Sequence, residues 1–161
     1  MNTNTIAIER SLAIKLLTLR VFALLALCAA YIQGPIVKLL DFGGAIAEME
    51  HFGLLPAPFF AAAVIAFELA MSALIVTGYW RWMGALALAV FTLAATWIAL
   101  RFWELPPGPA QSMAMNAFFE HVGLAGAFIF VAGNDLASRR TSGRAQYRSF
   151  GRDAATDIHK G

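Results

Sequence analysis

Four long runs of apolar residues, separated by short polar or proline-containing breaks, dominate the sequence. They cover roughly Leu16 to Lys38, Pro56 to Thr77, Trp82 to Trp103 and Met113 to Leu136. Each run approaches the length of about 20 residues that a helix needs to cross a hydrocarbon layer of about 30 Å. Because backbone N–H and C=O groups must be satisfied internally in lipid, we expect each run to be a transmembrane helix. The pattern therefore predicts an all-α fold, an integral membrane four-helix bundle.

The connection from Asp41 to Leu55 is too long for a simple turn. Its apolar residues recur at helical spacing: Phe42, Ile46, Met49 and Phe52. We interpret it as a short interfacial helix that lies on the outer membrane surface. Glu48 and His51 share the face of this helix opposite the apolar stripe.

The composition agrees with a membrane protein and excludes several other classes. Of 161 residues, 60% are hydrophobic and only 14% are charged, whereas soluble domains are about 45–50% apolar and about 25% charged. An ordinary soluble protein, a disordered chain and a nucleic-acid-binding module are therefore excluded. The single cysteine, Cys28, permits no internal disulfide and is expected to be a small core residue.

The distribution of Lys and Arg predicts the orientation in the membrane. Ten of the 12 lie before or at the start of the first run, between the second and third, or after the fourth, and only Lys38 and Arg101 lie on the other side. Because basic loops stay in the cytoplasm, we expect the N- and C-termini to be cytoplasmic. We divide the chain into a four-span membrane domain, residues 1–138, and a basic, mobile cytoplasmic tail, residues 139–161, which we expect anionic lipid to hold loosely.

Close helix packing is expected where small residues share a face. The second run carries Ala62, Ala66 and Ala70, and the fourth carries Gly123 with Ala127. Since small residues let helix backbones approach in a membrane, we expect these positions at helix–helix interfaces.

Glu68 is the first candidate for chemistry. It lies twelve residues after Pro56 and nine before Thr77, near the middle of the second run. An acidic side chain at this depth costs at least about 2.5–3.5 kcal/mol on insertion scales, so it must be protonated, paired or turned to a polar interior. Two interpretations stay open: a carboxyl group that accepts protons or orients a ligand, and an interhelical hydrogen bond that only fixes packing.

His121 is the second candidate, because its depth in the fourth run is close to that of Glu68. Glu120 projects about 100° away from His121, so one of the two at most points fully into the bundle. A neutral histidine hydrogen-bonded to a carboxylate is the alternative to a functional role.

Polar residues gather in the outer half of the predicted bundle. Lys38 is expected either to tilt inward at Gly34-Pro35 or to extend to the interface, and Arg101 either to pair with Glu104 or to line a pocket. The polar outer set is Lys38, His51, Arg101, Gln111, Glu120 and His121. We therefore expect any ligand site to open outward.

Sequence motifs for nucleotide binding, metalloprotease chemistry and thiol redox chemistry are not found. The sequence has no phosphate-binding loop, dinucleotide-binding glycine motif, H-E-x-x-H or C-x-x-C. We predict no metal site, although a metal held by Glu48, His51 and His121, or a haem between His51 and His121, stays open as a weaker alternative.

The order of these features resembles the DoxX family of small four-helix bacterial membrane proteins. The resemblance covers roughly residues 19–138. It begins with Arg20 through Gly34 and Lys38, continues with Phe52-Gly53-Leu54-Leu55-Pro56, and then has Glu68, Gly78 and Arg81. It ends with Phe118-Phe119-Glu120-His121 followed by Gly123 and Gly126. The sequence departs from the family at Glu120-His121, where Lys-Asn is common, and at Gly126-Ala127, where a glycine pair is common.

The resemblance implies a subunit of a bacterial inner-membrane redox complex linked to quinone, since the family includes such subunits. On this hypothesis the chain docks a partner redox protein and helps to form a pocket facing quinone or substrate. Glu68 would handle protons and His121 would orient a polar ligand. Lys38, Arg101 and Glu120 would contact the ligand, with the two cations attracting an anion.

Two other functions stay open. A structural membrane anchor or assembly protein would use its polar residues only for helix packing, and a small-solute or proton pathway would need no partner. A homo-oligomer is an alternative to a partner redox protein. Since no flavin or nicotinamide motif is present, we expect any redox centre to reside on the partner.

Overall fold

The computed structural model describes the backbone of residues 3–158 and the side chains of residues 8–141. Its α-helices are α1 (Thr3–Leu40), α2 (Phe42–His51), α3 (Ala57–Thr77), α4 (Arg81–Ala99) and α5 (Pro109–Ile158), with a 3₁₀ helix, η1 (Phe102–Glu104), between α4 and α5. Within the described part of the chain, four helical stretches are long and apolar enough to cross a membrane: Ile8–Leu40, Ala57–Thr77, Arg81–Glu104 and Pro109–Thr141. The prediction of an all-α, multi-pass membrane bundle is confirmed.

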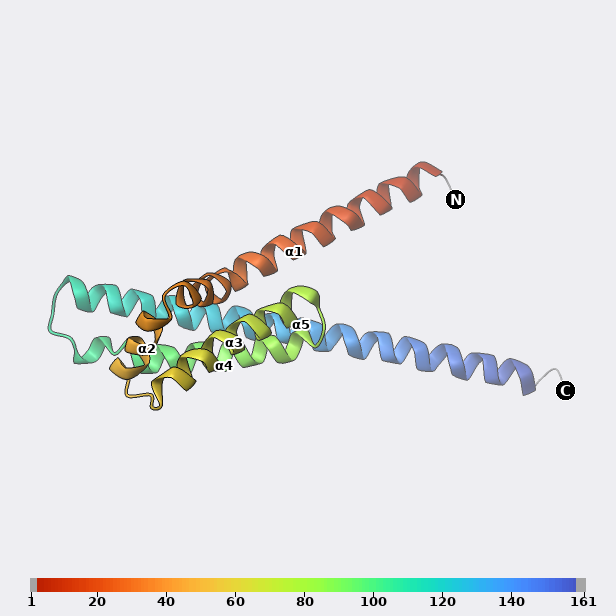
Figure 1. The fold of residues 1–161 in the computed structure, drawn as a ribbon. Helices are drawn as coiled ribbons and strands as arrows, with labels where there is room; N and C mark the ends of the chain where they lie inside the picture. Colours follow the sequence, from red (N-terminus) through yellow and green to blue (C-terminus); the bar gives the residue numbers. More distant parts are fainter. Residues whose placement is uncertain (1–2, 159–161) are drawn as a thin grey trace.

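The two ends of the bundle differ in what they carry (Figure 1). The start of α1, the end of α5 and the turn between α3 and α4 lie at one end, which we call the termini end. The short helix α2 and η1 lie toward the opposite end, which we call the α2 end. Helix α2 occupies the connection for which the sequence predicted an interfacial helix.

Local signals explain where the helices begin and end. The side chain of Asp41 caps α2 by accepting a hydrogen bond of 2.9 Å from the Gly44 N–H. Helix α3 begins directly after Pro56 and ends at Gly78, whose φ of 86° is the left-handed conformation that favours glycine at a helix C-terminus.

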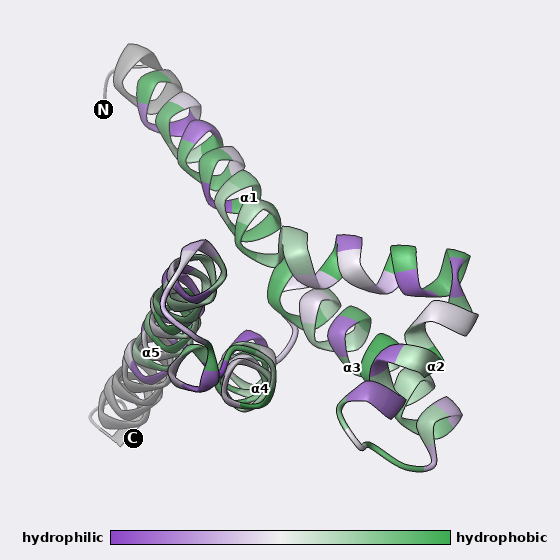
Figure 2. Ribbon diagram, turned by 90° about the vertical axis from the view of Figure 1, so that its left-hand side faces the viewer, coloured by the Kyte–Doolittle hydropathy of each residue, from purple (hydrophilic) through white to green (hydrophobic). Residues whose placement is uncertain are grey.

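Helix α1 bends instead of ending at its proline. Pro35 lies inside the helix, and the C-terminal segment that contains it turns away from the axis of the preceding residues (Figure 2). Proline removes a backbone hydrogen bond and its ring clashes with the preceding turn, so a kink is the expected result. The bend directs Lys38 toward α2.

Several boundaries differ from those predicted. Helix α1 begins at Thr3 instead of near Leu16, and α5 begins at Pro109 instead of near Met113. Helix α4 ends at Ala99, and η1 makes up the rest of the third span. Helix α5 does not end near Leu136 but continues to Ile158 through the basic segment. No proline interrupts that segment, and the change from apolar to basic residues marks where the apolar face ends, not where the helix ends. The side chains of residues 142–161 lie outside the described residues, so the separate tail remains a prediction.

The core lies where α1, α3, α4 and α5 meet. Its largest fully buried side chains include Cys28 of α1, Ile75 of α3, Leu88 of α4 and Phe128 of α5. In contrast, the N-terminal part of α1 is exposed along its length from Ile8 to Phe22. Figure 2 shows this part leaving the other helices, with many apolar residues along it.

Most of the small residues expected at helix–helix interfaces are exposed, and only Ala127 is partly buried. Ala62, Ala66 and Ala70 are exposed, as is Gly123. The buried face of α3 consists of Ala57, Ala61, Ile65, Glu68, Ser72 and Ile75. Apolar residues cover every side of this helix, so the sequence pattern does not show which side faces the bundle. The positions of small side chains alone did not identify the helix–helix interface.

The close approach between α3 and α4 occurs at Gly84. A Cβ atom there would lie 2.8 Å from the Met71 carbonyl oxygen and 3.0 Å from the Leu74 Cβ. Glycine is therefore required at this position by the spacing of the two helices.

Candidate functional site

A pocket of about 240 Å³ lies toward the α2 end of the bundle. Four helices line it: α1 through Lys38, α2 through Glu48 and Met49, α3 through Val64 and Glu68, and α4 through Phe91, Ala94, Ala95, Ile98 and Ala99, with Phe52 and Leu54 from the loop after α2. Three of these residues are charged, and the others are apolar. This is the character of a ligand pocket, with mostly apolar walls and a few polar groups that set orientation.

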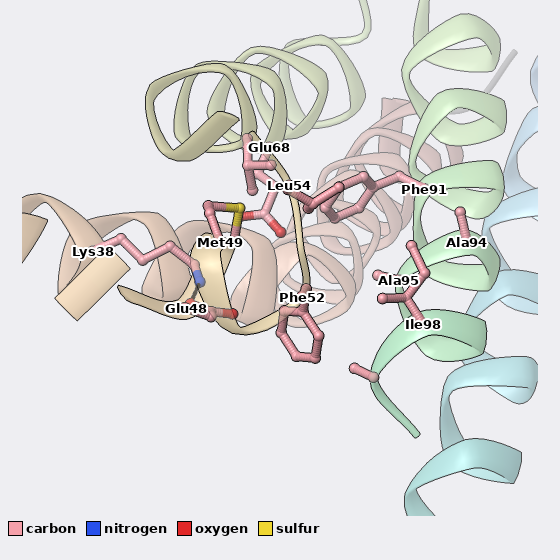
Figure 3. A pocket seen from close by; sticks show the side chains of 12 residues that line it. Lys38, Glu48, Met49, Phe52, Leu54, Glu68, Phe91, Ala94, Ala95 and Ile98 are labelled. Carbon is pink, nitrogen blue, oxygen red and sulfur yellow. Dashed lines mark hydrogen bonds and ion pairs between the residues drawn. The ribbon is translucent and has the colours of Figure 1, made fainter. Parts of the chain in front are cut away.

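Glu68 reaches from α3 into this pocket (Figure 3). The residue is only 9% exposed. Its Oε2 atom is buried and has no hydrogen-bond partner among the described residues. A buried polar atom without a hydrogen-bond partner costs about 1–3 kcal/mol of folding free energy, so a ligand that donates a hydrogen bond to this carboxyl group would be favoured here.

Lys38 and Glu48 form an ion pair beside Glu68 (Figure 3). The bend in α1 and the cap of α2 by Asp41 place these two side chains opposite one another. The Lys38 side chain is 19% exposed and that of Glu48 is 44% exposed. Lys38 and Glu48 are also the charged groups that act electrostatically on Glu68. The pocket thus carries one cation against two carboxyl groups.

Two buried hydroxyl groups, those of Tyr31 and Thr92, pair inside the bundle. The Thr92 hydroxyl donates to the Leu88 carbonyl oxygen at 2.6 Å, so its single proton is used. Tyr31 is therefore the donor in its own hydrogen bond with Thr92. The Tyr31 ring packs edge-on against Phe128, with ring centroids 5.4 Å apart, and this contact joins α1 to α5. Sequence analysis missed this network, although both residues lie within predicted apolar helices where a polar side chain needs a partner.

His121 does not meet Glu68. Its Nδ1–H donates to the Ala117 carbonyl oxygen at 2.6 Å, one turn earlier in α5, and the residue does not line the pocket. Glu120 is exposed and also lies outside the pocket lining. The expected meeting rested on depth along the helix axes, which says nothing about the direction in which each side chain projects.

Arg101 is likewise separate from the pocket. It pairs with Glu104 at 3.1 Å, and both side chains are about half exposed, at 53% and 52%. Of the six polar residues expected around an outward-opening site, this pocket includes only Lys38, which lines it together with Glu68. Arg101, Glu120 and His121 do not line it. The local sequence spacing of Arg101 and Glu104 favours pairing within one turn over convergence with distant residues.

The described residues contain no cluster of three or more His, Cys, Asp or Glu side chains that could hold a metal ion. The arrangement of Glu48, His51 and His121 considered from the sequence is therefore not formed. His51 is exposed, and its ring lies against Phe52, with centroids 5.1 Å apart.

A second charged cluster lies at the termini end. Asp135 of α5 is 8% exposed, and its Oδ2 accepts a hydrogen bond of 2.8 Å from Arg139 Nε. Its Oδ1 lies 4.0 Å from Nη1 of Arg81, at the start of α4. Arg81 Nε also donates to the Ile75 carbonyl oxygen of α3 at 2.8 Å. The cluster ties the ends of α3, α4 and α5 together, and sequence analysis did not single out Asp135.

A family model described as DoxX matches residues 16–101, which is more than half of the chain. The chain belongs to the DoxX family. The resemblance found in the sequence motifs is therefore confirmed. Comparison with curated proteins and with solved structures gave no match.

The matched segment of this DoxX protein contains the whole pocket. All lining residues fall between Lys38 and Ala99. Glu120 and His121 lie beyond the match, and so does Asp135. The pocket, and not the two polar residues of α5, therefore coincides with the segment shared with the family.

Proposed function

We propose that this DoxX protein is a membrane subunit of a quinone-linked redox complex, and that the pocket around Glu68 receives the quinone head group. The observation that carries the proposal is the unpartnered Oε2 of Glu68 in a pocket with otherwise mostly apolar walls. A quinone ring is flat and apolar and carries oxygens at opposite edges. It therefore needs the combination found here: apolar contact and a few hydrogen-bonding groups.

The size of the pocket supports a head group over a whole lipid. Its volume of about 240 Å³ lies below the range of about 300–1,000 Å³ typical of pockets that enclose a drug-sized ligand. One ring fits such a space, while the isoprenoid tail would remain among the lipid chains.

The polar residues suit both redox forms of the ligand. A quinone oxygen accepts a hydrogen bond from the Lys38 ammonium group, and a quinol hydroxyl donates to the Glu68 carboxyl oxygen. Oxidation of a quinol releases two protons and two electrons, and Glu68 is placed to accept a proton in that step. The electrons go to a redox centre on a partner protein, since this chain carries no flavin or nicotinamide motif.

The expected location follows from the charge distribution. Ten of the 12 basic residues of the sequence come before or at the start of the first apolar run, between the second and third, or after the fourth, which favours a cytoplasmic position for both termini in a bacterial inner membrane. The pocket would then lie in the half of the bilayer away from the cytoplasm.

Photoaffinity labelling tests this function. We expect an azido-quinone to label the protein in lipid nanodiscs at residues of α2, α3 or α4 that line the pocket. An excess of unlabelled short-chain quinone should suppress the labelling. Label confined to lipid-facing residues, or unaffected by competitor, would contradict the proposal and favour the structural anchor. Proton or solute flux into liposomes that hold no partner would instead favour a pathway.

A further inference from the structure

The charged cluster at the termini end contains more positive than negative charge. Arg81 and Arg139 both approach Asp135, and Arg81 is also repelled by Arg20 of α1 and by Arg139. Two guanidinium groups thus face one carboxylate, and Arg20 adds a third positive charge that acts on Arg81. A second anion would balance the excess charge.

Among the side chains that the structure describes, Arg81 has hydrogen-bond donors left over. Its Nε is used by the Ile75 carbonyl oxygen, whereas its Nη1 lies 4.0 Å from the Asp135 carboxylate, too far for a hydrogen bond. The side chain is only 14% exposed, so its position is fixed by the surrounding helices. Arg139, with 47% of its side chain exposed, forms the open edge of the cluster. A guanidinium group presents its N–H donors in a rigid fork that matches phosphate oxygens.

Two aromatic residues mark the depth of this cluster in the membrane. Tyr79 and Trp80 directly precede Arg81, are 68% and 46% exposed, and stack with ring centroids 6.0 Å apart. Exposed Tyr and Trp residues at the end of a transmembrane helix typically lie at the level of the lipid head groups. The arginines next to them are therefore at the level of lipid phosphates.

We propose that Arg81 and Arg139 bind the phosphate group of an anionic phospholipid. The lipid phosphate balances the charge that Asp135 leaves uncompensated and joins the α3–α4 turn to α5. Free phosphate offers the same oxygens, but the exposed aromatic pair favours a ligand with acyl chains.

Binding of a fluorescent phosphatidylglycerol, labelled on its tail, tests the proposal. The purified protein is titrated in micelles that contain an excess of phosphatidylcholine, which carries no net charge. We expect Arg139→Gln to weaken binding about tenfold, equivalent to about 1.4 kcal/mol. Arg101→Gln is the matched control, because Arg101 pairs with Glu104 at the other end of the bundle, and it should leave binding unchanged.

Asp135→Asn separates a lipid site from a purely structural cluster. Asparagine keeps an oxygen that accepts the hydrogen bond from Arg139 but removes the competing negative charge. A lipid site predicts several-fold tighter phosphatidylglycerol binding by this variant. Weaker binding by Asp135→Asn, or unchanged binding by Arg139→Gln, would overturn the proposal.

Inorganic phosphate distinguishes the two sources of the ligand. At millimolar concentration and constant ionic strength, we expect it not to displace phosphatidylglycerol. Displacement would assign the cluster to free phosphate and overturn the lipid assignment. Arg139→Gln carries the test even if Arg81→Gln fails to fold, because the Arg139 side chain is half exposed.

Discussion

The ammonium group of Lys38, beyond the bend of α1, pairs with the carboxylate of Glu48 on α2, and both side chains line the pocket that contains Glu68. Because of the bend, the Lys38 side chain lines the pocket instead of extending to the membrane interface. Because α1 and α2 are consecutive helices, this pair also sets where α2 lies over the pocket.

The ion pair predicts rescue by charge exchange. Lys38→Glu alone places a third carboxyl group at the pocket and should displace α2 by like-charge repulsion. Combining it with Glu48→Lys restores an ion pair, so the α2 amides should regain most of their wild-type protection against hydrogen exchange. Hydrogen exchange of the α2 amides measures this effect.

The exposed pair Arg101 and Glu104 is the control for this experiment. Exchanging its charges should leave α2 unchanged, because neither residue lines the pocket. If the α2 amides exchanged hydrogen at the same rate in the Lys38→Glu variant and in the double variant, the ion pair would not hold α2 in place.

Gly84→Ala should separate α3 from α4. The added Cβ would lie 2.8 Å from the Met71 carbonyl oxygen, a backbone atom that cannot move without shifting the helix. Overpacking of this kind typically costs about 1–3 kcal/mol. Reversible unfolding in mixed micelles measures the loss of folding free energy.

Gly123→Ala is the matched control for this substitution. A Cβ at Gly123 meets nothing within 4 Å, and this position is also helical. Its folding free energy should stay within about 1 kcal/mol of wild type, since alanine is the better helix former. Equal losses in the two variants would contradict the close approach of α3 and α4.

Tyr31→Phe should lower stability without changing the helical content. The substitution removes the hydroxyl that donates to Thr92, while Thr92 keeps its hydrogen bond to Leu88. A loss of about 1 kcal/mol is expected for one buried hydrogen bond. The same unfolding measurement checks it, with Tyr79→Phe as control because Tyr79 is 68% exposed. Wild-type stability of Tyr31→Phe would exclude a structural role for this bond.

The sequence predicted the features that depend on composition and spacing along one helix. The four apolar runs, the α2 helix and the removal of the Glu68 carboxyl group from lipid all follow from local patterns. The pairing of Arg101 with Glu104, one of the two alternatives considered, follows from their separation of three residues. These conclusions need no knowledge of how the helices face one another.

Features that depend on helix rotation could not be predicted. Apolar residues surround α3 on all sides, so the pattern did not show that Glu68 and Ser72 share the buried face while Ala66 is exposed. For the same reason His121 was expected near Glu68, although it bonds within its own helix. Lys38 and Glu48 met because of a bend, whose direction a proline in the sequence does not specify.

The most direct test of the proposed function is equilibrium binding of a short-chain quinone to the protein in lipid nanodiscs, with Glu68→Gln compared with Glu120→Gln. The two variants carry the same chemical change, but Glu68 lines the pocket and Glu120 is exposed outside it. We predict about tenfold weaker binding for Glu68→Gln, equivalent to about 1.4 kcal/mol, and wild-type affinity for Glu120→Gln. Equal affinity of both variants and the wild type would contradict a quinone site at Glu68.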